Sequence, residues 1–116
     1  MQIPIQIKAD SRPVVLRTFL GDQAYQSGSS IQTPGGGELI WDGRVEKSWE
    51  TVIIGFILSI PGSVAVNLLS NWLYDRLKKS KSKEITIYRK TYRVIDLNSQ
   101  RIQEIIEETI KEVHDK

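Results

Sequence analysis

The sequence contains no cysteine and only one histidine, His114, close to its C-terminal end. Without cysteine the chain cannot form disulfides, thiolate zinc sites, iron–sulfur clusters or a cysteine nucleophile. A metal cluster or a histidine-based catalytic triad would depend on His114 alone. We therefore expect a protein without a metal site or a cofactor.

Short sequence motifs of catalysis are also missing. The chain contains no G-x-S-x-G, H-E-x-x-H or G-x-G-x-x-G pattern. The three consecutive glycines at 35–37 are not followed by the Lys-Ser/Thr pair of a phosphate-binding loop. The Gly-, Ser- and Pro-rich residues 26–38 predict a flexible connecting loop instead. We expect a non-catalytic protein with no small-molecule substrate.

The chain also lacks a strong excess of either charge. Its 116 residues include 16 Lys and Arg and 14 Asp and Glu, a net charge of +2, which does not predict nucleic-acid binding. Half of the basic residues nevertheless lie in one stretch: Arg76, Lys78, Lys79, Lys81, Lys83, Arg89, Lys90 and Arg93. Acidic residues gather at positions 104–115. Such separated patches suit self-association or a protein partner, although a solvated surface of mixed charge is the simpler interpretation.

The first 48 residues predict a β-rich part of the chain. Ile3, Ile5 and Ile7 alternate with polar residues, the period of two that is typical of a half-buried strand. Pro4 cannot donate to a neighbouring strand, so we expect this strand at an edge of the sheet. Residues 14–20 predict a second strand, which can pair with the first as a hairpin. A third, short strand at 39–41 is followed by a tight turn at Asp42-Gly43.

The central residues 51–74 carry no charge (TVIIGFILSIPGSVAVNLLSNWLY). Their hydropathy, the flanking Trp49 and Trp72, and the basic run that follows are features of a membrane-spanning helix. One alternative is therefore a single-span inner-membrane protein with its C-terminal module in the cytoplasm. Pro61-Gly62 interrupts the segment, however, and favours a strand or short helix at 52–58 followed by a helix at 61–79. We prefer this second interpretation and a cytoplasmic protein.

Two helical faces are predicted after Pro61. The apolar face comprises Val64, Ala65, Leu68, Leu69, Trp72, Leu73 and Leu77. The polar face comprises Ser63, Asn67, Ser70, Asn71, Asp75 and Lys78. A helix that lies on a sheet has such a polar stripe, whereas a helix surrounded by lipid does not need one.

Small residues at a spacing of four predict a further feature of this segment. They are Gly55, Ser59, Ser63, Asn67 and Asn71. On a continuous helix this spacing allows two backbones to approach closely, so the stripe is either an oligomerisation seam or the outward face. Together with Arg76, Lys78, Lys79, Arg89, Lys90 and Arg93, these residues are the candidate interaction site.

The C-terminal third predicts a β-hairpin at 84–96 and a helix at 98–114. A turn near Arg89-Lys90 would pair Ile87 with Tyr92 and Ile85 with Val94. The absence of glycine there indicates a turn longer than two residues.

The final helix has two sequence signals of its own. Asn98 is a good N-cap residue, and Leu97 can pack against Ile102 at the start of the helix. Its apolar stripe comprises Ile102, Ile105, Ile106, Ile110 and Val113.

The segment from Ser59 to Asp96 resembles one in small bacterial conflict-system proteins called effector-associated constant components. The shared features are a hydrophobic helix that ends in NWLYDRLKK and the strand–turn–strand EITIYRKTYRVID. The resemblance implies a non-enzymatic accessory module that works beside a variable effector in prokaryotic defence. It carries no functional residues across.

Taken together, the pattern predicts one α+β domain over residues 1–116. A small, mainly antiparallel sheet packs against a central hydrophobic helix and a C-terminal amphipathic helix. The expected function is a protein–protein interaction or assembly module, either a homo-oligomer or the binder of a protein partner. A chain of this size has room for one modest core, so assembly is a natural source of extra stability. Membrane association, and nucleic-acid binding through residues 76–93, are the two alternatives.

Overall fold

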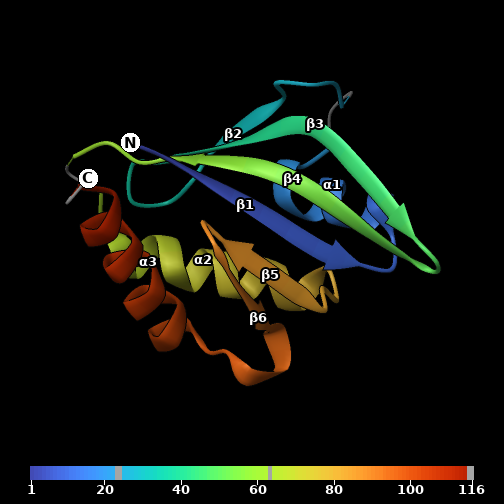
Figure 1. Ribbon diagram of the computed structural model, residues 1–116. Helices are drawn as coiled ribbons and strands as arrows, with labels where there is room; N and C mark the ends of the chain where they lie inside the picture. The colour runs from blue at the N-terminus through green and yellow to red at the C-terminus, as the bar shows by residue number, and fades with distance from the viewer. Residues whose placement is uncertain (23–24, 63, 115–116) are drawn as a thin grey trace.

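A computed structural model describes residues 1–22, 25–62 and 64–114 of the protein. Six strands form one antiparallel sheet in the order β2-β3-β4-β1-β5-β6. The strands are β1 (Gln2–Ala9), β2 (Ser30–Gln32), β3 (Glu38–Ser48), β4 (Thr51–Ser59), β5 (Glu84–Ile87) and β6 (Lys90–Arg93). The helices are α1 (Arg12–Leu20), α2 (Val66–Lys79), α3 (Ser99–His114) and the short 3-10 helix η1 (Val94–Asp96). The predicted α+β architecture is confirmed (Figure 1).

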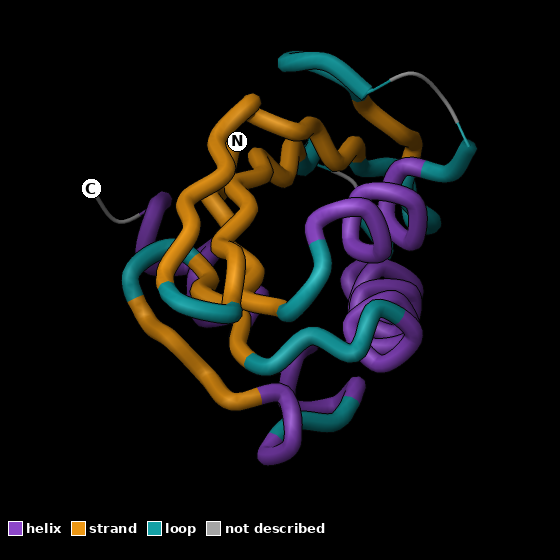
Figure 2. Tube along the Cα trace, turned by 90° about the vertical axis from the view of Figure 1, so that its right-hand side faces the viewer, coloured by secondary structure: helices purple, strands orange, loops and turns teal. Residues whose placement is uncertain are grey.

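The helices α1 and α2 lie on one side of the sheet (Figure 2). Helix α3 packs against α2 and β5, and the core lies between the sheet and the three helices. Alternate residues of the long strands point toward the helices and are buried. The sheet contributes Ile3, Ile5, Ile7, Leu39, Trp41, Ile54, Phe56, Leu58, Ile85 and Ile87 to this core. The helices contribute Val15, Leu16, Phe19, Leu20, Leu69, Leu73, Leu77, Ile102, Ile105 and Ile106.

Strand β1 occupies the centre of the sheet, between β4 and β5, so the prediction of an edge strand was wrong. Pro4 is tolerated there because β5 pairs only with Ile5 to Lys8. The carbonyl of Pro4 accepts a hydrogen bond from Tyr88 N at 2.9 Å, just beyond the end of β5. Pro4 has no N–H to donate toward β5. None is needed there, because the pairing of β1 with β5 does not extend to Pro4.

Residues 14–20 form helix α1 rather than the predicted strand, so no hairpin joins them to β1. Ser11 caps the helix by accepting a hydrogen bond from Val14 N, and Pro13 lies in the first turn, where its missing N–H costs nothing. Phe19 is fully buried, with its ring 5.7 Å from Phe56 and 5.9 Å from Trp72. Packing of this face against the sheet outweighs the strand propensity of the Val-Val sequence.

The apolar segment 51–74 is divided between β4 and the start of α2. None of the helices in the described ranges combines the length and the hydrophobicity that a membrane span requires. Of the two alternatives for residues 52–58, a strand or a short helix, the structure contains the strand, and α2 begins at Val66, five residues later than expected. Trp49 is fully exposed at the turn between β3 and β4, and Trp72 is half-buried on α2, so the two do not flank one helix.

The buried face of α2 differs from the expected one at two positions. Ser70 is fully buried and donates to the carbonyl of Val66 at 2.7 Å, whereas Leu68 is 49% exposed. Because the serine hydroxyl is satisfied within its own helix, burying it costs little. Leu69, Leu73 and Leu77 occupy the core as predicted.

The region predicted as a flexible loop contains β2 and a packed turn. Ala65 N donates to the carbonyl of Gly35 at 3.0 Å, which joins the turn to the chain just before α2. Gly35 has φ +88°, and a Cβ there would lie 2.6 Å from the carbonyl oxygen of Ala65. The glycines therefore permit close approach to another part of the backbone rather than flexibility.

Strand β3 is longer than the short strand predicted at 39–41 and continues to Ser48. Its pairing with β4 shifts register between Trp41 and Val45 and then resumes. Asp42-Gly43 forms part of this β-bulge and not a chain-reversing turn. A bulge adds residues to one strand without ending the pairing, so β3 continues beside β4 beyond it.

The C-terminal hairpin forms with a register two residues from the expected one. Ile87 pairs with Lys90 and Ile85 with Tyr92, which makes Tyr88-Arg89 a two-residue turn. The turn forms without glycine because Tyr88 itself adopts a φ of 62°. A shift of two preserves the faces of a strand, so the predicted inward face is retained.

The final helix agrees with its prediction. Arg101 N donates to Asn98 Oδ1 at 2.8 Å, which confirms the N-cap. Leu97, Ile102, Ile105 and Ile106 are buried.

Candidate functional site: the open face of the sheet

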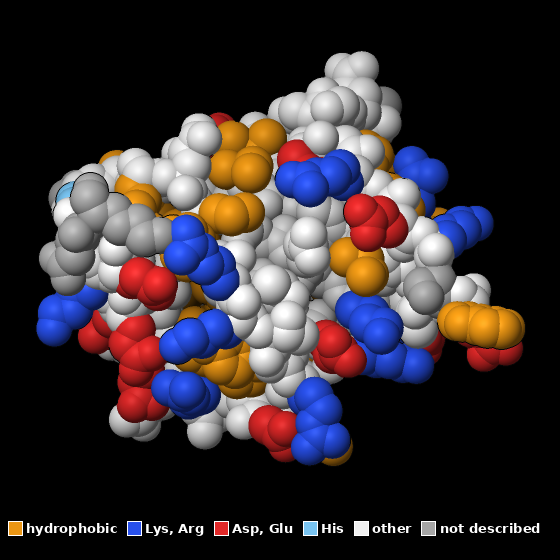
Figure 3. All heavy atoms as spheres, viewed as in Figure 1, with side chains coloured by type: hydrophobic (Ala, Val, Ile, Leu, Met, Phe, Trp, Pro, Cys, Tyr) orange, Lys and Arg blue, Asp and Glu red, His pale blue; other side chains and the backbone are white. Residues whose placement is uncertain are grey.

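The side of the sheet away from the helices is the main candidate for function, and we call it the open face. No helix or strand in the described part of the chain covers it. Figure 3 shows hydrophobic side chains among charged ones on this side of the molecule. The alternation of β1, β3, β4, β5 and β6 places on it Gln2, Pro4, Gln6, Lys8, Glu38, Ile40, Glu46, Thr51, Ile53, Gly55, Ile57, Ser59, Glu84, Thr86, Thr91 and Arg93.

An apolar row crosses the open face. Ile40 on β3 lies opposite Ile57 on β4, which in turn lies opposite Pro4 on β1. The two isoleucines are half-buried and Pro4 is exposed, and none of the three belongs to the hydrophobic core. Side chains in this position remain accessible to another molecule.

The β-bulge places an acidic side chain over the middle of this face. Asp42 accepts hydrogen bonds from Arg44 N at 2.8 Å and from Arg44 Nε at 3.1 Å. Its carboxylate lies above Gly55, where a Cβ would be 2.6 Å from Asp42 Oδ2. Glycine at position 55 therefore provides the space that the carboxylate occupies.

This arrangement predicts that Gly55 and Asp42 are energetically coupled. Gly55→Ala should destabilise the protein by about 1 kcal/mol, because the methyl group displaces the carboxylate from its bonds to Arg44. In an Asp42→Ala background the same change should be neutral or stabilising by about 0.5 kcal/mol, since alanine suits a strand better than glycine. Urea unfolding of the two single variants and the double variant measures this coupling. Equal effects in the two backgrounds would show that the carboxylate does not occupy this space.

A shallow hollow lies beside the glycine, on the β1 and β5 side. It has a volume of about 200 Å³ and is lined by Gln6, Lys8, Ile53, Glu84, Thr86 and Thr91. Lys8 Nζ lies 3.9 Å from Glu84 Oε2, with both side chains 37% exposed, so this pair contributes little to stability. The hollow is open and polar, and its two threonine hydroxyls, Thr86 Oγ1 and Thr91 Oγ1, are hydrogen-bonded to each other at 2.7 Å. Across the described ranges, no group of His, Asp and Glu side chains is arranged to hold a metal ion.

The predicted small-residue stripe does not form a single face. Gly55 and Ser59 lie on the open face of β4, whereas Asn67 and Asn71 lie on α2, beside a polar groove between α2 and α3. Ser63 is outside the described residues. The prediction of one helical seam was wrong because a strand, and not a helix, carries the first two residues.

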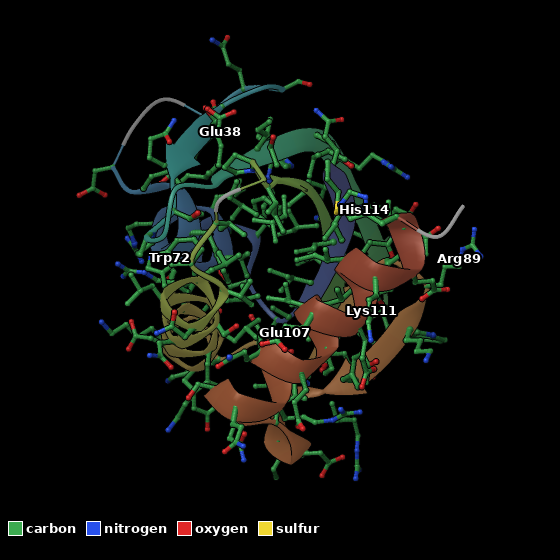
Figure 4. The ribbon with its side chains drawn as sticks, turned by 90° about the vertical axis from the view of Figure 1, so that its left-hand side faces the viewer. Glu38, Trp72, Arg89, Glu107, Lys111 and His114 are labelled. Carbon is green, nitrogen blue, oxygen red and sulfur yellow. The ribbon has the colours of Figure 1, made fainter. Side chains whose placement is uncertain are left out.

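The predicted basic cluster is also divided between separate places. Arg76, Lys78 and Lys79 lie at the C-terminal end of α2, whereas Arg89 and Lys90 lie at the hairpin turn. In Figure 4, Trp72 of α2 and Arg89 project on opposite sides of α3.

Several of these basic residues contact acidic or aromatic side chains. Lys79 is 3.2 Å from Asp75, and Arg93 is 2.9 Å from Asp96. Arg76 and Arg89 lie over the rings of Trp72 and Tyr88, respectively. A continuous basic surface of the kind that follows a phosphate backbone does not arise from this arrangement.

The sequence prediction missed Ile40, Ile53 and Ile57. The signal was present in residues 52–58, which are apolar on both faces of a strand (VIIGFIL). A strand with one face in water normally alternates, whereas a near-continuous apolar run is typical of a strand that is covered on both faces. Treating the segment as a strand places Ile53, Gly55 and Ile57 together on the face opposite the core.

Comparison with known proteins adds no family to this description: no protein-family model matches the chain, and neither the curated proteins nor the solved structures include a match.

Proposed function

We propose that the protein is a non-catalytic assembly module that binds another protein chain through the open face of its sheet. The observation that carries this proposal is strand β4, which is apolar on both faces although the helices cover only one. Ile53 and Ile57 are half-buried on the uncovered side. A partner that covers them would remove apolar surface from water.

The rest of the open face supports binding to a protein. An apolar centre surrounded by charged and polar side chains is the usual composition of a protein interface. Here Ile57 and its neighbours are bordered by Glu38, Glu46, Lys8 and Glu84. The resemblance of the C-terminal half to effector-associated constant components suggests the setting, an accessory component of a prokaryotic defence system.

Nucleic-acid binding is less well supported. The open face contains acidic residues as well as basic ones, and Lys79 and Arg93 are in ion pairs. A phosphate backbone would meet Glu46 and Glu84 there.

Site-specific photocrosslinking tests the proposal. A photoreactive amino acid in place of Ile57 should crosslink to a defined protein chain in an extract of the host cell, and peptide mass spectrometry identifies that chain. The same probe in place of Leu68 is the matched control. Leu68 is also a branched aliphatic residue, is 49% exposed, and lies on α2, away from the open face.

With the probe at position 57, we expect one dominant crosslinked protein. The same protein should not be crosslinked by the probe at position 68. Glu46→Lys in the chain that carries the probe should reduce the yield of this product, because it changes the charge beside Ile53. No product at 57, or the same products at 57 and 68, would contradict binding through the open face.

A further inference from the structure

We propose that the partner of the open face is a second copy of this chain, packed face to face about a two-fold axis that runs along β4. This inference rests on the proposed function and names the partner. Three observations carry it: the register of the three long strands, the charges at the two sides of β4, and the area available.

The register places the residues of β3 and β1 symmetrically about β4. Ser59 lies between Glu38 and Gln2, Ile57 lies between Ile40 and Pro4, and Ile53 lies between Glu46 and Lys8. Neighbouring strands are about 4.8 Å apart. The β3 member and the β1 member of each set are therefore at equal distances from β4, on opposite sides.

A two-fold axis along β4 exchanges these two sides. It places β4 on β4 of the second copy, and β3 on its β1. Ile57 then packs on Ile57 of the second copy, and Ile40 packs on its Pro4, so the apolar row covers itself. Two sheets packed face to face are about 10 Å apart, which allows side chains of this size to interdigitate.

The charges become complementary under the same operation. Glu46 faces Lys8 of the second copy, and the symmetry forms this pair twice. Glu46 is exposed and forms no ion pair within the described residues, and the contact of Lys8 with Glu84 is long, at 3.9 Å. Both charges are available to a partner.

Two other positions of an axis parallel to the strands lack this complementarity. An axis between β4 and β1 would place Glu46 opposite Glu84 of the second copy, and an axis along β1 would place Lys8 opposite Lys8. Like charges in direct opposition suppress an interface. Of these three arrangements, only the axis along β4 pairs Glu46 with Lys8. This axis also brings together the two Asp42 carboxylates, which lie above Gly55, and each of them is already paired with Arg44 of its own chain at 3.1 Å.

The available area is sufficient for a weak, specific dimer. The strands β3, β4 and β1 together are about 14 Å wide, and the eight residues of β1 are about 27 Å long. The two copies together would bury on the order of 1,000 Å², below the range of stable interfaces and within that of weak, transient complexes. We therefore expect a dissociation constant in the micromolar range.

A charge exchange tests the arrangement. In sedimentation velocity over a series of concentrations, the purified chain should form a dimer. Glu46→Lys and Lys8→Glu should each raise the dissociation constant by about tenfold, because each creates two like-charge contacts. The double variant should return to within about threefold of the original value, since it restores both pairs with the charges reversed.

Matched controls are available on α3. Lys111→Glu and Glu112→Lys change the same charges at exposed positions away from the open face, and they should leave the dissociation constant unchanged. Circular dichroism of every variant establishes that it is folded. Because the chain has no cysteine, Ile57→Cys provides a second measurement with a single thiol per copy. A short bifunctional maleimide should join two copies at position 57, and Leu68→Cys should remain monomeric.

The outcomes separate this inference from the proposed function. In the first outcome, the purified chain stays monomeric and the probe at position 57 captures a different protein in the extract. This result overturns the proposal that the partner is a second copy and leaves the open face as the binding surface. A dimer whose double variant is not restored overturns the axis along β4. A monomer with no crosslink at position 57 under either condition overturns both proposals.

Discussion

Replacing Phe56 with alanine should reduce the free energy of unfolding by about 3–5 kcal/mol. Phe56 is fully buried at the centre of β4, and its ring lies 5.7 Å from that of Phe19 on α1. The substitution removes the contact between the two rings and leaves a cavity between the sheet and α1. A domain of this size typically has a stability of about 5–15 kcal/mol, so the loss is a large share of the total.

Urea unfolding followed by circular dichroism measures this effect. Leu68→Ala is the matched control, because Leu68 is 49% exposed and should change the stability by no more than about 0.5 kcal/mol. If the two variants lost the same free energy, Phe56 would not be part of a tightly packed core.

Gly35→Ala should produce the second large effect, a loss of about 3 kcal/mol or more. Two costs add: alanine is strained at φ +88°, by about 1–2 kcal/mol, and its Cβ would lie 2.6 Å from the carbonyl oxygen of Ala65. That oxygen belongs to the backbone, so relief requires the chain before α2 to move. Overpacking of this kind costs about 1–3 kcal/mol.

Gly28→Ala separates the two costs. Gly28 has a similar φ of +93°, but nothing lies within 4 Å of the position of its Cβ. It should therefore show the strain alone, about 1–2 kcal/mol. The difference between the two variants in thermal or urea unfolding measures how tightly the glycine turn packs against the start of α2. Equal losses would mean that the turn can move away from Ala65 without cost.

The elements that sequence analysis placed correctly are those with strong local signals. Asn98 and the isoleucine stripe that follows it specify α3 by capping and by a period of 3.6. The alternation of Ile3, Ile5 and Ile7 specifies the inward face of β1. Each of these signals lies within one element and does not depend on what packs beside it.

The errors occurred where a distant part of the chain decides the structure. Residues 14–20 have the composition of a strand, but the burial of Phe19 against β4 and α2 makes them a helix. Pro4 indicated an edge strand, but β5 ends before it would need a donor from that residue. Local propensity cannot represent either contact.

The candidate site required knowledge of register, which the sequence did not supply. That Asp42 lies over Gly55, and that Glu46 and Lys8 lie on the two sides of Ile53, depends on the bulge in β3 and on two separate strand pairings. The small-residue stripe is a pattern of period four that runs from strand β4 across a loop into α2, so no single helix carries it. The apolar run of β4 was visible in the sequence. It was weighed only as a membrane span or a core segment, and not as a strand with a second, uncovered apolar face.

The central position of β1 has a consequence for the order of folding. Of the six strands of this sheet, β1 is synthesised before the others, and it pairs with β4, about fifty residues later, and with β5, about eighty residues later. Pairings of such long range are slow to form, because the intervening chain must be ordered first. Until both neighbours have left the ribosome, Ile3, Ile5 and Ile7 have no sheet in which to be buried, and a nascent chain that stops before residue 87 leaves one side of this strand unpaired.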